Sequence, residues 1–255
     1  MQTVDGIPFF DTPGWDPEIG IDEALDALGW TAFKVQCGGE ENALGTLRSA
    51  LRSGPVMVGP VEMGHLRHQP GMSGPIGADH YLVVLDFDRD GVTAHDPQGY
   101  PYARIAIADL LAAWRAPLSY GAPFTMRSSL RRVRAVADGD ALAVALARAK
   151  ARLDAGGRSS ERAAAGLAST VAAGCPSDLR GHLIHFAVRV GARRRADAAA
   201  CLQRAGRPGP AEVLTEQARL IGSLQRPLVT GEDETAATAL RELAETFARL
   251  RDTLT

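Results

Sequence analysis

The chain has 255 residues, of which 45% are hydrophobic, 23% charged and 5% aromatic, and its formal net charge is −2. This composition is typical of a globular protein with one large or two small domains, and it needs no disulfide or metal to stabilise its core. The near-zero net charge argues against general electrostatic binding to nucleic acid, and no apolar run approaches the ~20 residues of a membrane span.

Three cysteines, Cys37, Cys175 and Cys201, cannot all pair with one another. An odd number argues against a secreted disulfide scaffold, and the first residues lack the basic and apolar segments of a signal peptide. We therefore expect a cytoplasmic protein with neither a nucleic-acid nor a membrane partner, and a homodimer stays open as an alternative.

The first half of the chain alternates between predicted helices and strands. Apolar residues at helical spacing and β-rich runs are separated by glycine and proline, which end each element. The predicted elements are a helix over 22–28 ending at Gly29, a strand over 31–36, a helix carrying Leu44, Leu47 and Leu51, and a buried strand over 56–58.

Two β-rich runs around a short turn give the clearest pattern in the chain. Residues 80–88 and 92–96 flank the turn Arg89-Asp90-Gly91, which predicts an antiparallel hairpin. A further strand over 103–106 and a helix from Ile107 to Trp114 follow. The first half is therefore predicted to be α+β.

The second half is predicted to be helical throughout. Its sequence is rich in Ala, Leu, Arg and Glu, and helices are expected over 140–153, 159–173 and 177–205, with two more opening near Pro210 and Gly231. This shift in composition predicts an α+β domain over 1–125 and an all-α helical bundle over 126–255.

The two ends of the hairpin carry a candidate acid–base pair. His80 begins one strand and Asp96 ends its partner, so antiparallel pairing brings them onto neighbouring strands within side-chain reach. A carboxylate on one imidazole nitrogen fixes the tautomer and leaves the other nitrogen as a base. We therefore expect His80 and Asp96 to be hydrogen-bonded; the alternative is that both polar ends face water.

The same residues carry a resemblance to a known family. Gly54-Pro55-Val56, the run from Asp79 to Val84 and the run from Val92 to Tyr100 resemble papain-like cysteine peptidases of the bacteriocin-processing type, and more closely the amino-terminal domain of BtrH-like proteins of butirosin biosynthesis. The resemblance covers about residues 5–118 and implies a papain-like antiparallel-sheet domain. It also implies that His80 is the general base and that Asp96 orients it.

The family's nucleophilic cysteine has no clear counterpart in the chain. In the family it opens a helix near the start of the domain, so either a preceding segment is missing or the nucleophile has been lost. Cys37 is a candidate substitute, because it lies beside two glycines and precedes a predicted helix. Against this, Glu40 and Glu41 disfavour a thiolate, and Cys37 is more simply a structural thiol. Ser73 is a weaker candidate.

Other polar residues are candidates for binding substrate. Glu62 and His65 follow the buried strand and Gln98 follows Asp96, so all three are expected to line a substrate pocket. His65, His68 and His80 do not have diagnostic metal-ligand spacing, so neither a metal nor a cofactor is predicted.

The resemblance implies an acyltransferase or an amide or thioester hydrolase of specialised metabolism with a Cys-His-Asp type of site. Its partner would be a small-molecule acyl substrate or one bound to a carrier protein. The arginine clusters at 131–134 and 193–195 suit a phosphate or carboxylate, but a solvated surface balanced by acidic residues is the simpler explanation. The alternative function is a catalytically inactive papain-like binding or scaffold protein that has lost its nucleophile.

Overall fold

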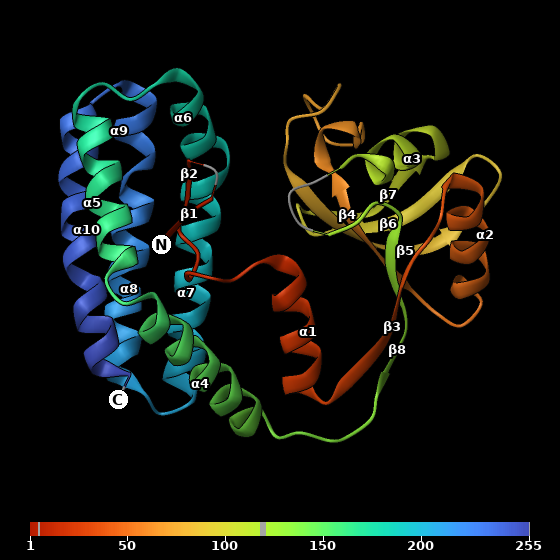
Figure 1. Cartoon of the computed structure of the whole chain (residues 1–255), viewed down its shortest axis with the longest axis horizontal. Helices are drawn as coiled ribbons and strands as arrows, with labels where there is room; N and C mark the ends of the chain where they lie inside the picture. The colour runs from red at the N-terminus through yellow and green to blue at the C-terminus, as the bar shows by residue number, and fades with distance from the viewer. Residues whose placement is uncertain (5, 118–120, 255) are drawn as a thin grey trace. The chain divides into compact units, whose positions relative to one another are not determined.

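A computed structural model describes residues 1–4, 6–117 and 121–254. The chain divides into two compact units (Figure 1): one spans Asp16–Val136, and the other combines Met1–Trp15 with Ala137–Thr255. The first unit is α+β with an antiparallel sheet and the second is largely helical, as the sequence predicts. The predicted boundary at 125/126 differs from this division, because residues 125–132 form a strand of the sheet.

In the described part of the sheet unit, six strands form one sheet, and each neighbouring pair is antiparallel. The described residues also form three α-helices and one turn of 3-10 helix, η1. In spatial order the strands are β3 (Trp30–Gln36), β8 (Thr125–Arg132), β4 (Val56–Glu62), β5 (Asp79–Phe87), β6 (Gly91–Asp96) and β7 (Tyr100–Ala106). The helices are α1 (Pro17–Leu28), α2 (Glu40–Leu51), α3 (Ile107–Arg115) and η1 (Met63–His65).

One face of the sheet carries the hydrophobic core of this unit. Side chains alternate between the two faces of a strand, so His80, Leu82 and Val84 of β5 are all buried on the same face. Helices α2 and α3 cover that face with fully buried side chains, including Leu47 and Trp114. The candidate histidine therefore lies at the end of a row of core residues.

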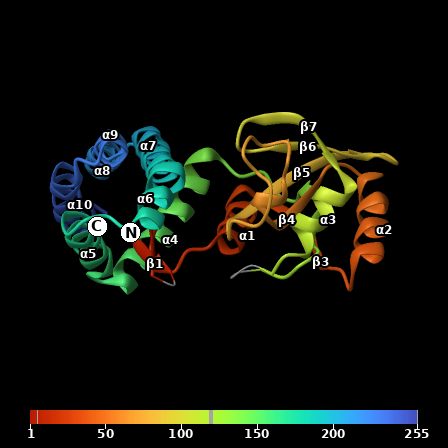
Figure 2. The same cartoon turned by 90° about the horizontal axis from the view of Figure 1, so that it is seen from above.

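The opposite face of the sheet binds α1 through a buried ion cluster. Figure 2 shows α1 and α2 on opposite sides of the sheet. Arg127 of β8 is 1% exposed and donates two hydrogen bonds to Glu18 (2.9 and 2.8 Å) and one to Asp22 (2.9 Å). Glu18 also accepts from Tyr81 (2.8 Å) and pairs with Lys34. These contacts, rather than apolar packing alone, fix α1 on the sheet.

Helix α1 begins earlier than the sequence predicts and ends where it predicts. Asp16 caps the first turn by accepting a hydrogen bond from the backbone of Ile19 (2.8 Å), and Pro17 occupies the first helical position. Gly29 ends the helix with a left-handed φ of 73°. A Cβ at this position would lie 2.4 Å from the carbonyl oxygen of Arg134, so glycine is also needed for the close approach.

The helical unit is a bundle with a small amino-terminal hairpin, β1 (Gln2–Val4) and β2 (Ile7–Phe9). The predicted helix over 177–205 is instead two helices joined by a π-helical turn, Leu183–Ala187, and a short helix precedes the last one. The helices are α4 (Asp138–Gly156), α5 (Ser159–Ala172), α6 (Ser177–His182), α7 (Val188–Arg204), α8 (Pro208–Ser223), α9 (Gln225–Thr230) and α10 (Asp233–Thr253). Among the described residues, no helix combines the length and apolarity needed to cross a bilayer.

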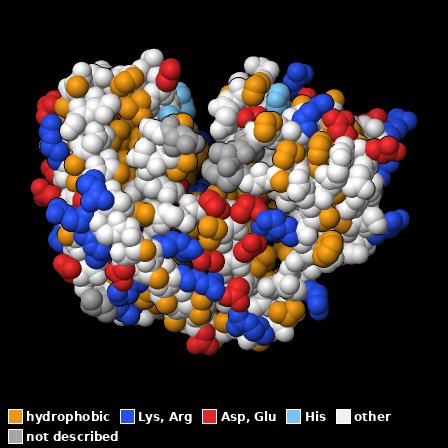
Figure 3. All heavy atoms as spheres, viewed as in Figure 1, with side chains coloured by type: hydrophobic (Ala, Val, Ile, Leu, Met, Phe, Trp, Pro, Cys, Tyr) orange, Lys and Arg blue, Asp and Glu red, His pale blue; other side chains and the backbone are white. Residues whose placement is uncertain are grey.

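Both arginine clusters contain residues with structural contacts, and in the first of them Arg134 pairs with Asp26. Arg194 pairs with Asp11 and lies 4.7 Å from the centre of the Trp15 ring, and Arg195 is buried and donates to the carbonyl of Phe10 (3.0 Å). In Figure 3, basic and acidic side chains are interspersed over the face in view. These contacts favour the simpler interpretation of the second cluster as part of the fold.

Candidate active site

The candidate site lies at one end of the sheet, where β4 and β6 end and β5 begins. Val83 pairs with His95, so Asp96 is diagonal to His80 across the two strands. Nε2 of His80 lies 2.8 Å from Oδ1 of Asp96, and both residues are buried. The expected contact between His80 and Asp96 is therefore confirmed, although their catalytic roles stay predictions.

Asp96 accepts four hydrogen bonds, two on each carboxylate oxygen. Oδ1 accepts from Nε2 of His80 and from the backbone N–H of Gln98 (2.7 Å). Oδ2 accepts from Nε2 of His68 (2.7 Å) and from the side-chain amide of Gln69 (2.6 Å). The carboxylate is thus fixed from both sides, on Oδ1 by donors of β5 and of the turn after β6, and on Oδ2 by donors of the loop after η1.

These donors keep Asp96 ionised. Burial alone would raise the pKa of Asp96, but hydrogen bonds from His80, from the backbone of Gln98 and from His68 outweigh it and hold this pKa well below its usual range. An ionised carboxylate can only accept, so we assign the proton of each neutral imidazole to Nε2. Nδ1 of His80 is left with a lone pair, as a general base requires.

Glu62 organises the neighbouring loop. Its side chain is buried, and its two oxygens accept hydrogen bonds from the backbone N–H groups of Gly64 (3.0 Å), Ile76 (3.0 Å) and Gly77 (2.9 Å). The loop is also held by a bond from the backbone of Gly74 to the carbonyl of Gly64 (3.0 Å). These bonds give Glu62 a role in shaping the loop beside the site, and its contact with a substrate stays a prediction.

The other predicted substrate-binding residues lie at the same end of the sheet. His65 ends η1 and is half-buried. Gln98 reaches the site through its backbone N–H, while its side-chain amide lies 3.8 Å from the sulfur of Met63. Contact of His65 and Gln98 with a substrate stays a prediction. Ser73, the weaker candidate nucleophile, is exposed in the loop that leads to β5, and its role also stays a prediction.

Cys37 is not brought to His80. Its thiol is 6% exposed within the hydrophobic core, directly after β3, and its backbone N–H donates to the carbonyl of Phe124 (3.0 Å). The order β3-β8-β4-β5 separates its strand from that of His80 by three strand spacings. At roughly 4.8 Å each, these amount to about 14 Å, far beyond direct contact between thiol and imidazole. The geometry gives no support to Cys37 as the partner of His80.

Two partners of Asp96 are not predicted as such. The sequence suggests that His68 could line a substrate pocket and shows no metal-ligand spacing for it, and it does not single out Gln69. No sequence motif marks His68 and Gln69 as partners of Asp96, because they reach it through a loop that is held by tertiary contacts. In the part of the chain that the structure describes, no three His, Cys, Asp or Glu side chains form a group that could hold a metal ion.

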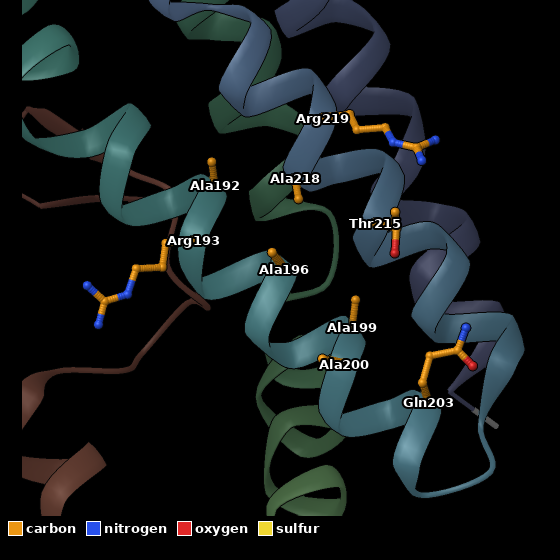
Figure 4. Close-up of a pocket in the computed structure, with 9 residues that line it drawn as sticks. All are labelled: Ala192, Arg193, Ala196, Ala199, Ala200, Gln203, Thr215, Ala218 and Arg219. Carbon is orange, nitrogen blue, oxygen red and sulfur yellow. The ribbon is translucent and has the colours of Figure 1, made fainter.

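A separate groove lies in the helical unit between α7 and α8 (Figure 4), with a volume of about 630 Å³. Alanines form most of its lining, with Arg193, Gln203, Thr215 and Arg219 around them. It contains neither a carboxylate nor an imidazole, so it lacks the acid–base groups found around Asp96.

Comparison with known proteins concerns the helical unit. The family model described as the YobF C-terminal domain matches residues 154–255. The uncharacterized protein YobF of Bacillus subtilis (strain 168) is 31% identical over 102 residues, which are 40% of this chain and 33% of that protein. The match thus spans about a third of that relative's length. The family match begins within α4, so the sheet unit with His80 and Asp96 lies outside it.

Proposed function

We propose that the unit Asp16–Val136 is a papain-like domain that catalyses acyl transfer from, or hydrolysis of, a thioester or amide, with His80 as general base. The observation that carries this proposal is the 2.8 Å contact of Nε2 of His80 with Asp96, which leaves Nδ1 as the basic nitrogen. Three free cysteines favour a reducing compartment, and we place the protein in the cytoplasm.

Cys37 takes no part in the proposed reaction, because it lies in the hydrophobic core three strands away from His80. Nδ1 of His80 takes a proton from the acyl acceptor, water or an amine, as the acceptor attacks the carbonyl carbon. The carbon–sulfur or carbon–nitrogen bond then breaks, and the imidazolium returns the proton to the leaving thiolate or amine. Asp96 stabilises the imidazolium between these two transfers.

A second candidate function is a papain-like binding or scaffold protein that holds an acyl group without turnover. The position of Cys37 in the core, three strands from β5, favours it, because an intact cysteine site would place the thiol beside the histidine.

Turnover distinguishes the two functions. Acetyl-coenzyme A is offered to the full chain, with and without an amine acceptor, and release of the free thiol is recorded. We expect turnover that falls roughly 10²–10⁴-fold in His80→Ala and is unchanged in Cys37→Ser. Turnover lost equally in Cys37→Ser would restore the cysteine mechanism. Binding of acetyl-coenzyme A without thiol release in any variant would favour the binding protein.

A further inference from the structure

A second imidazole holds Asp96 and has no part in the proton transfer described above. Nε2 of His68 donates to Oδ2 of Asp96 at 2.7 Å, and the side chain of His68 is only 9% exposed. Its Nδ1 is buried and has no hydrogen-bond partner among the described residues. Burial therefore costs this imidazole one hydrogen bond to water, and the bond to Asp96 is what it gains.

The unpartnered nitrogen also defines the state of His68. A proton on Nδ1 would be a buried N–H donor without an acceptor. An unsatisfied buried donor costs more free energy than an unused lone pair. The geometry therefore places the proton that His68 donates on Nε2. His68 acts toward Asp96 as a fixed donor, in the same way as the amide of Gln69 at 2.6 Å.

The donors are arranged so that the carboxylate cannot turn without losing all of them. His80 and the backbone of Gln98 hold Oδ1, and His68 and Gln69 hold Oδ2. The ring of His68 also packs edge-on against Tyr100, with centroids 5.6 Å apart and planes at 90°, a contact that adds no hydrogen bond to Asp96. Turning the carboxylate away from His80 would break four hydrogen bonds of the charged group, each stronger than its neutral counterpart.

We propose that His68 is a positioning residue for the His80–Asp96 pair: it holds the carboxylate by Oδ2, so that Oδ1 stays aimed at Nε2 of His80. The effect of His68 on a reaction rate rests on the proposed function. The effect of His68 on the hydrogen bond between His80 and Asp96 is independent of that function and can be observed without substrate.

The test compares three variants of the full chain. His68→Phe keeps an aromatic ring against Tyr100 but removes the donor, whereas His68→Gln restores a side-chain N–H donor. Tyr100→Leu removes the ring contact and leaves His68 itself intact. Imidazole ¹⁵N–¹H spectra report the Nε2 proton of His80, and thiol release from acetyl-coenzyme A reports kcat and KM.

In His68→Phe we expect the Nε2 proton of His80 to exchange with water and its signal to be lost, and kcat to fall about tenfold or more with KM within about twofold. In His68→Gln the signal returns and kcat recovers to within about threefold. In Tyr100→Leu we expect the Nε2 proton signal of His80 to be retained, even if this variant unfolds at a lower urea concentration than the wild type.

Three results would overturn the inference: a His80 signal unchanged in His68→Phe, a signal that His68→Gln fails to restore, or one lost equally in Tyr100→Leu. If His68→Phe does not fold, the His68→Gln spectrum decides, since a retained signal supports the inference and a lost one overturns it. If the wild type releases no thiol while the spectra behave as expected, the proposed function fails with this probe and the positioning role of His68 stands.

Discussion

Replacing Asp96 with asparagine removes the charge and exchanges one of two acceptor oxygens for an NH₂ donor. The single oxygen of the asparagine amide can serve only one side of the site. The backbone N–H of Gln98 can only donate, so it requires that oxygen to remain in the place of Oδ1, facing His80. The NH₂ group must therefore face His68 and Gln69, which both donate to Oδ2 in the wild type.

Both of these residues must then become acceptors. Gln69 can turn its amide, and His68 can move its proton from Nε2 to Nδ1. Nδ1 of His68 is buried without a partner among the described residues, so this second change creates an unsatisfied N–H donor. Such a donor costs about 1–3 kcal/mol, and the loss of the charge from four hydrogen bonds adds to it, so we expect Asp96→Asn to lose about 2–4 kcal/mol of unfolding free energy.

Urea denaturation measures the loss, and imidazole ¹⁵N spectra report the tautomers. The expected result is that His68 changes tautomer while His80 keeps its proton on Nε2. In the double variant His68→Gln with Asp96→Asn, the oxygen of the introduced glutamine accepts from the NH₂ group of the introduced asparagine, so roughly 1–2 kcal/mol returns. The reasoning is refuted if His80 changes tautomer instead, or if Asp96→Asn unfolds at the wild-type urea concentration.

Three further predictions concern the rest of the chain. Arg127→Met leaves Glu18 without its main partner and should lower the free energy of unfolding, measured by urea denaturation, by about 3 kcal/mol. The loss should be smaller when Glu18→Gln is added, and a loss below about 0.5 kcal/mol for Arg127→Met alone would contradict the buried cluster. Burial raises the pKa of Glu18, but hydrogen bonds from its partners lower it to about 2 from 4.5, so their contribution to stability is complete above pH 4.5 and is lost as the pH falls toward 2. Glu18→Gln should flatten this part of the curve of urea midpoint against pH, and an unchanged slope would contradict the assignment. Alkylation of the native protein should modify the half-buried Cys201 before Cys37, and mass mapping that finds Cys37 modified first would show that its thiol is accessible.

The sequence predicts the elements whose pattern is local. The hairpin of β5 and β6 follows from β-rich runs around Arg89-Asp90-Gly91, and the contact between His80 and Asp96 follows from antiparallel pairing. The end of α1 at Gly29 follows from the absence of a side chain.

Other features depend on residues far apart in the chain. Burial does not alternate regularly along β8, since Arg127 is buried through its pairs with Glu18 and Asp22, which lie 109 and 105 residues away in the chain. The same holds at the site, where the four donors to Asp96 come from β5, from its own turn and from the loop after η1. A sequence pattern shows that such residues are polar, but it does not show that they all donate hydrogen bonds to one carboxylate.

The most direct test of His80 as general base is thiol release from acetyl-coenzyme A by His80→Ala, with and without added imidazole. The cavity left by the ring can admit free imidazole, which supplies the missing base. We predict a rate lowered roughly 10²–10⁴-fold that rises with imidazole concentration in His80→Ala and does not rise in the wild type. Wild-type turnover in His80→Ala without imidazole would contradict the assignment of His80 as the base.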